Sequence, residues 1–106
     1  MNVKQRIQIH QLNKAFENRV RLGIMSSLMV NDQLDFNQLK ELLEVTDGNL
    51  ASHLKSLEGL KFVKMEKSFV GRKPNTRYQI TDTGSTAFQE HVNALEALIK
   101  MQTGKG

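Results

Sequence analysis

The 106-residue chain contains no cysteine. Without a thiol it can form no disulfide framework and no thiolate metal site, which fits a reducing cytosol. No apolar signal region opens the chain, and no apolar run approaches the length of a membrane span. No internal repeat, linker or low-complexity stretch divides it. We therefore expect a soluble cytoplasmic protein with a single domain over 1–106, in which 102–106 form a flexible tail.

The sequence signatures of catalysis are also missing. There is no glycine-rich phosphate loop, no nucleophile elbow and no cluster of acids, bases and nucleophiles. The histidines His10, His53 and His91 are scattered, and His91 has only Glu90 and Glu96 beside it as metal ligands, with no second histidine at ligand spacing. The sequence therefore predicts no enzyme, no metal site and no cofactor.

Residues 46–61 show the clearest pattern in the chain, an amphipathic helix. Thr46 is a suitable N-cap, and Asp47 adds negative charge where the helix dipole favours it. Three leucines at helical spacing form one face, and the opposite face is small, polar and basic: Gly48, Asn49, Ser52, Lys55 and Ser56. Such a face suits close approach to base edges in the DNA major groove, although an ordinary surface helix also has a polar outer face.

The stretch that follows predicts a β-hairpin. Residues 62–70 alternate apolar and charged side chains, 71–75 (GRKPN) combine turn residues with two positive charges, and 76–81 form the return strand. An amphipathic helix followed directly by a hairpin with a basic tip matches a recognition helix and its wing. The helix and the hairpin together are far more specific than either alone, and they indicate a winged helix-turn-helix.

At this point the sequence resembles a known family, the small winged-helix DNA-binding domains related to MarR- and ArsR-type transcriptional regulators. The residues that carry the resemblance are TDGNL (46–50), SHL (52–54), LE (57–58), GRKPNTRY (71–78) and ITDTG (80–84). The resemblance extends from about Phe16 to the last helix. It departs at Lys61, because relatives carry a glycine at this helix end, where a left-handed residue is favoured.

The remaining elements complete this fold. We expect helices over 3–15, from Phe16 to about 30–32, over 37–44 and over 82–101, with Asn18 and Asp35 as possible N-caps. Residues 33–36 leave room for a short strand that pairs with the wing. The expected class is mainly α (α+β): about five helices with a small two- to three-stranded antiparallel wing sheet.

The positive charge is concentrated on one part of the chain. Residues 46–80 hold seven lysines and arginines against three acidic residues, whereas the rest is balanced, so this segment carries the whole net charge of +4. A basic hairpin can be merely a solvated face. This basic hairpin directly follows the helix predicted over 46–61, whose polar face suits the DNA major groove, and this favours a polyanionic partner instead.

The resemblance implies a homodimeric transcription regulator, more specifically a repressor that binds double-stranded DNA at an inverted repeat. Asn49 and Ser52 are candidates for reading base edges, whereas His53 is more suited to packing or to a structural hydrogen bond. For Asn37 and Gln38, plain solvation is an alternative to a phosphate contact. The residues expected to contact DNA are Asn37, Gln38, Thr46, Gly48, Asn49, Ser52, Lys55, Ser56, Lys64, Lys67, Arg72, Lys73 and Arg77.

The last helix carries a wider apolar stripe than so small a domain needs, so we expect part of it to meet a second chain. The residues expected at the dimer interface are Val3, Ile7, Phe88, His91, Val92, Leu95, Leu98 and Ile99. An unknown small-molecule effector is possible at that interface. The alternative function is a winged-helix module that docks proteins without binding specific DNA, which would require an exposed apolar patch rather than a basic wing.

Overall fold

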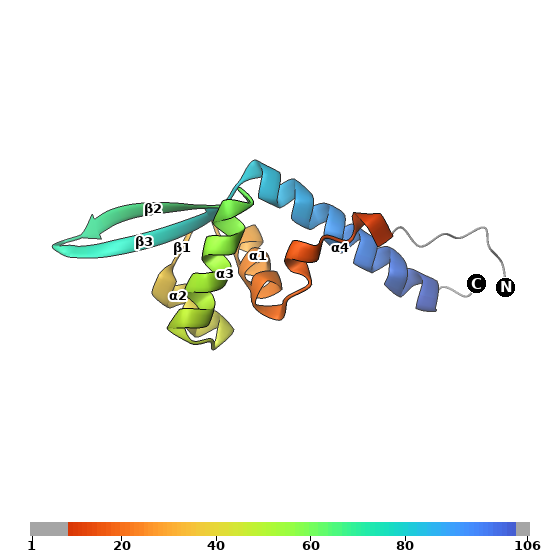
Figure 1. Cartoon of the computed structure of the whole chain (residues 1–106), viewed down its shortest axis with the longest axis horizontal. Helices are drawn as coiled ribbons and strands as arrows, with labels where there is room; N and C mark the ends of the chain where they lie inside the picture. The colour runs from red at the N-terminus through yellow and green to blue at the C-terminus, as the bar shows by residue number, and fades with distance from the viewer. Residues whose placement is uncertain (1–8, 104–106) are drawn as a thin grey trace.

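A computed structural model describes residues 9–103, and over this range the chain forms the predicted winged helix. Its elements are the 3-10 turns η1 (Ile9–Gln11) and η2 (Lys14–Phe16), the helices α1 (Arg19–Val30), α2 (Phe36–Leu43), α3 (Asp47–Gly59) and α4 (Asp82–Thr103), and the strands β1 (Leu34–Asp35), β2 (Val63–Val70) and β3 (Lys73–Ile80). The β2–β3 hairpin and the far end of α4 project from opposite ends of the helical body (Figure 1). No helix of residues 9–103 has both the length and the apolar composition needed to cross a membrane.

The helix starts follow from local side chains, as predicted. Asn18 is extended and its side chain accepts hydrogen bonds from the backbone N–H groups of Val20 and Arg21, so α1 begins at Arg19. Asp35 caps α2 and forms a capping box with Gln38. Both caps confirm the sequence-based assignment, with α2 starting one residue before the predicted 37.

The core is formed where α1, α3 and the base of the sheet meet. α1 contributes Val20, Ile24, Met25 and Leu28, and α3 contributes Leu50, Leu54 and Leu57, all buried. Each side chain of this size contributes roughly 1.5–3 kcal/mol when it is fully removed from water. The outer side of α3 is therefore held at a fixed orientation by its buried side.

The sheet has the order β1–β3–β2, and all pairs are antiparallel. Leu34 pairs with Tyr78, so the short strand predicted at 33–36 does join the wing. Leu34, Val63 and Tyr78 are buried and lie on one face of the sheet, because cross-strand partners and alternate residues share a face. The helical body packs on this face.

A single threonine joins three elements at the base of the wing. The Thr81 hydroxyl donates to the Lys61 carbonyl oxygen at 2.6 Å and accepts from the Gly84 N–H at 2.9 Å, while the Thr81 N–H donates to the Phe62 carbonyl oxygen at 3.0 Å. A Cβ atom on Gly84 would overlap the Phe62 carbonyl oxygen. Glycine is therefore required for α4 to begin this close to the start of β2.

Aromatic rings fill the space between η2, the hairpin and α4. The Phe16 ring lies 5.4 Å from that of Phe62, 5.2 Å from that of Phe88 and 5.3 Å from that of His91. His91 is buried, and its Nδ1 accepts a hydrogen bond from the Asn13 N–H at 2.9 Å. Burial lowers the pKa of His91 below its ordinary value, and the Glu17 carboxylate opposes this in part.

Several sequence-based boundaries were wrong. Within the described residues, η1 and η2 stand in place of the helix predicted over 3–15, because Asn13 and Asn18 each cap a new start. Phe16 consequently precedes α1 instead of beginning it. The described residues form four α-helices instead of about five. The wing turn is the pair Gly71–Arg72, so Lys73, Pro74 and Asn75 belong to β3. α4 continues to Thr103, beyond the predicted 101, and the rest of the expected tail lies outside the described residues.

Lys61 adopts a left-handed conformation with φ 63°, although it is not glycine. A side chain there costs roughly 1–2 kcal/mol in backbone sterics, whereas glycine costs roughly 0.5–1 kcal/mol in unfolded-state entropy. We expect Lys61→Gly to raise the free energy of unfolding by about 0.5–1 kcal/mol, measured by urea denaturation. Lys61→Ala removes the same charge but keeps the strain, so an equal gain in that control would contradict this account.

The buried His91 should make stability depend on pH. Its pKa is lower in the folded than in the unfolded chain, so protonation favours unfolding, and its stabilisation is lost as pH falls through about 6.5. We expect the free energy of unfolding to fall between pH 7.5 and 5.5, and to fall less in His91→Gln. His10→Gln alters an exposed histidine and should retain the wild-type fall. Identical pH profiles for all three proteins would exclude this role of His91.

Candidate nucleic-acid interface

The face of α3 opposite its buried leucines is open and nearly free of bulk. Gly48, Asn49, Ser52, Lys55 and Ser56 are all exposed there, as predicted. Ala51 is exposed as well, and the sequence analysis did not single it out. Its methyl group is an apolar contact of the kind that meets the thymine methyl in a major groove. Because this face carries almost no bulky side chains, the helix backbone can approach a polar partner closely.

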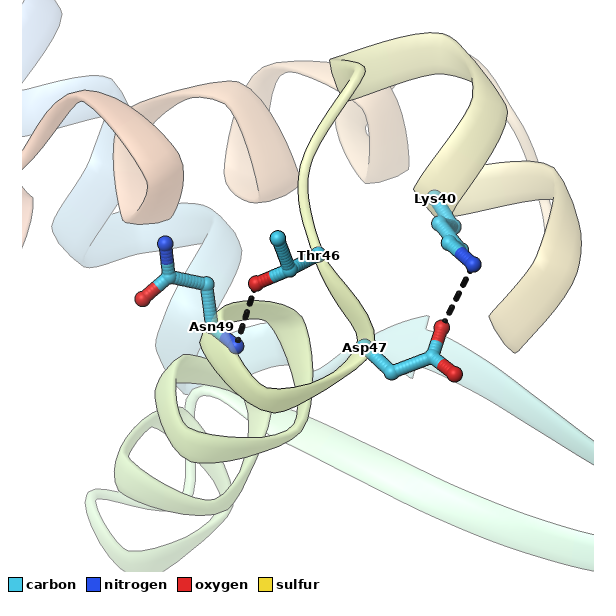
Figure 2. Close-up of polar contacts among 4 residues, drawn as sticks. All are labelled: Lys40, Thr46, Asp47 and Asn49. Carbon is cyan, nitrogen blue, oxygen red and sulfur yellow. Dashed lines mark hydrogen bonds and ion pairs between the residues drawn. The ribbon is translucent and has the colours of Figure 1, made fainter.

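The start of α3 is fixed by two polar contacts (Figure 2). The Thr46 hydroxyl oxygen accepts from the Asn49 N–H at 3.2 Å, and the Lys40 ammonium lies 2.8 Å from the Asp47 carboxylate. The ion pair joins α2 to α3 and is solvent-exposed, so it contributes at most about 1 kcal/mol. The carboxamide of Asn49 points away from both contacts in Figure 2. The backbone of Asn49 is thus held while its side chain extends outward.

The N-terminus of α2 adds two exposed polar residues, Asn37 and Gln38. The Gln38 side-chain oxygen accepts from the Asp35 N–H at 2.9 Å, so the capping box engages its acceptor, and its NH₂ group can still donate. Gln38 and Arg77 line the same hollow with Gln33 and Asp35, and Arg77 Nη1 donates to the Gln33 side-chain oxygen at 3.4 Å. The structure therefore brings together two predicted contact residues from α2 and from β3.

The predicted cations of the wing are exposed but do not share one face. Lys67 lies on the face that carries Val63 and Tyr78, because it follows Val63 by four residues. Lys64, Lys73 and Arg77 lie on the opposite face, and Arg72 is in the turn. The hairpin can therefore present a cation to phosphates on either of its sides.

The sequence predicted no hydrogen-bond partner for His53, and the structure supplies one from α1. Arg21 Nε donates to His53 Nδ1 at 3.0 Å and so links α1 to α3. Burial and the neighbouring guanidinium both lower the pKa of His53, which favours the neutral ring that accepts this bond. The expected structural hydrogen bond of His53 is present. Its partner lies 32 residues away, and no local pattern marks it.

The residues predicted at a dimer interface fall into three groups. Val3 and Ile7 lie outside the described residues. Phe88 and His91 are buried within this chain, so its own core already accounts for their position. Val92 is half-buried and packs against the same core, Leu98 is half-buried, and Leu95 and Ile99 are exposed on the far half of α4. An apolar surface thus remains on α4 beyond the aromatic cluster.

Comparison with known proteins agrees with this geometry. Residues 20–99 match the family described as "Winged helix DNA-binding domain". The uncharacterized protein MJ0432 of Methanocaldococcus jannaschii is 39% identical over 87 residues, which cover 82% of this chain and 95% of that protein.

Two solved structures show the same fold. The transcriptional regulator homologue protein from Pyrococcus horikoshii OT3 superposes with a TM-score of 0.78 and 36% identity, over 83% of this chain and 87% of that one. A MarR family transcriptional regulator from Silicibacter pomeroyi has a TM-score of 0.67 and 16% identity, over 89% of this chain and 62% of that one. The predicted resemblance is confirmed: the chain belongs to the winged helix DNA-binding domain family and has the fold of MarR-type transcriptional regulators.

Proposed function

We propose that this DNA-binding transcriptional regulator is a homodimeric repressor that occupies an inverted-repeat operator and blocks polymerase sterically. The observation that carries the proposal is the exposed, small and polar face of α3 beside a hairpin with a basic tip. Residues 46–80, which include both segments, hold the entire excess of positive charge. A protein that docks other proteins through this surface would need no such charge.

In this proposal α3 enters the major groove. Gly48 and Ala51 keep the helix close to the bases, and Asn49 and Ser52 read base edges, with the Asn49 carboxamide matched to the paired donor and acceptor of adenine. Lys55 reaches guanine or a phosphate. Thr46 and Ser56 position the helix on the backbone, for which the hydrogen of the Thr46 hydroxyl remains available as a donor.

The wing occupies the adjacent minor groove. Arg72 and Lys73 at the hairpin tip are the principal contacts, because narrow A/T segments attract cations. Lys64, Lys67 and Arg77 are secondary phosphate contacts. Asn37 and the NH₂ group of Gln38 meet a phosphate at the N-terminus of α2.

Dimerisation through α4 would bring two copies of the DNA-binding surface into one complex. Leu95 and Ile99 are exposed, and Val92 and Leu98 extend the same apolar region. Val3 and Ile7 are proposed to join it from the N-terminal segment. Two recognition helices would then enter successive major grooves, with half-sites about one helical turn apart. A small-molecule effector at this interface and a cytoplasmic location stay predictions.

The first test is titration of the protein into random and genomic duplex DNA at several salt concentrations, with its mass in solution recorded. We expect a dimer that selects an inverted repeat and whose affinity falls steeply with salt. Arg72→Ala should weaken binding to every sequence and reduce the salt slope by about 2 per dimer, because one cation is lost from each of the two wings. Lys100→Ala removes the same charge from α4 and should leave the slope unchanged.

Absence of binding at low salt would refute the proposal and direct the search to protein partners. A salt slope that Arg72→Ala leaves unchanged would remove the wing from the interface.

The readout role of Asn49 makes a separate prediction. Asn49→Ala should lose roughly 1–3 kcal/mol on the selected site while non-specific binding stays nearly intact. Because the cap on α3 uses the backbone N–H of Asn49, this substitution leaves the cap in place. Competition of the selected site against random DNA measures the difference. Equal losses on both DNAs would assign Asn49 to the backbone instead.

A further inference from the structure

The wing tip carries two apolar side chains that the proposed function has not used. Phe69 is 73% exposed and Val70 is 57% exposed, next to the turn of a hairpin that extends beyond the helical body (Figure 1). Two such residues at the end of a projecting hairpin contribute little to folding. Phe69 is the larger and the more exposed of the two, and an aromatic ring this exposed at a projecting tip is a candidate for a binding contact.

The two side chains point to opposite faces of the hairpin. Phe69 pairs with Pro74 and shares a face with Met65 and with the buried Val63 at the base of β2. The helices pack on this face at the base of the hairpin, and the described residues leave the same face exposed at the tip. Phe69 thus opens onto the side of the sheet on which α3 lies, whereas Val70 lies on the other side.

One cation shares the face of Phe69, and two more lie close to it along the chain. Lys67 precedes it by two residues on the same face, and Arg72 and Lys73 follow in the turn and at the start of β3. An aromatic ring paired with a proline across the hairpin, with one cation on its own face and another in the turn, fits a partner with anionic rims and an apolar interior. The minor groove of duplex DNA has both, since phosphates line its edges and sugars and stacked bases lie within.

We propose that Phe69, supported by Pro74, enters the minor groove as an apolar wedge at one base step and partly unstacks it. The inference rests on the proposed function and adds a specificity determinant to it. Arg72 and Lys73 hold the groove edges while the ring opens the step. Unstacking is easiest at TA and CA/TG steps, so the wing selects a flexible step without hydrogen bonds to bases.

The test uses a duplex that the wild-type protein selects from a random pool, with the step beneath the wing located by footprinting. That step is then varied between TA and AA, and 2-aminopurine placed there reports unstacking by its fluorescence. Phe69→Ala should lose about tenfold in affinity for the TA duplex and lose the fluorescence rise and the TA preference, with an unchanged salt slope. Phe69→Leu should keep most of each effect.

Val70→Ala is the matched control, because it shortens a neighbouring exposed apolar residue on the opposite face and should behave as wild type. If the wild-type protein binds no DNA, the proposed function and the wedge both fail. If it binds DNA with the expected salt slope but Phe69→Ala changes neither affinity nor step preference, the wedge alone is wrong. Loss of binding to phosphatidylserine vesicles or of self-association in Phe69→Ala, with DNA binding unchanged, would also overturn it.

Discussion

The contacts of Thr81 are the constraint on which the functional surfaces depend. Its side chain and backbone bond to Lys61, Phe62 and Gly84, and so fix the end of α3, the start of β2 and the start of α4 relative to one another. The recognition helix and the wing are consecutive in the chain, and this junction fixes the angle between them together with the core that they share. In the proposed complex this surface fits two adjacent grooves, which would require that angle to be constant.

Strained backbone flanks the recognition helix on both sides. Glu44 ends α2 with φ 51°, and Lys61 follows α3 with φ 63°. Neither is glycine, so the chain holds α3 between two residues in an unfavourable conformation. The strain is offset by the leucines that α3 buries and by the hydrogen bond that the Lys61 carbonyl accepts from Thr81. The chain therefore changes direction sharply just before and just after α3.

Sequence reasoning succeeded where the determinants are local. Thr46, Asn18 and Asp35 cap their helices through atoms two or three residues away, and leucine spacing defines the buried side of α3. The exposed face of α3, which is the centre of the candidate site, was predicted for the same reason.

It failed where the determinants are distant. The pairing of Arg21 with His53 and of Asn13 with His91 joins separate helices, so no periodicity reveals it. Pro74 was assigned to the turn on its usual preference, yet it lies in β3 at a position where only β2 is a neighbour, and there its missing N–H is tolerated. The division of the wing cations between two faces follows from that register.

The junction at Thr81 also has a mechanical consequence. α4 has 22 residues, and at 1.5 Å per residue it is a rod of about 33 Å. A rotation of about 10° at its first turn would displace the far end by about 6 Å, by simple leverage along a helix of this length. In the proposed dimer joined at the far ends, a small change in angle there would alter the separation of the two recognition helices by several ångströms. The hydrogen bonds of Thr81, together with the packing of Phe88 and His91, would then limit how far the spacing of the two half-sites can vary.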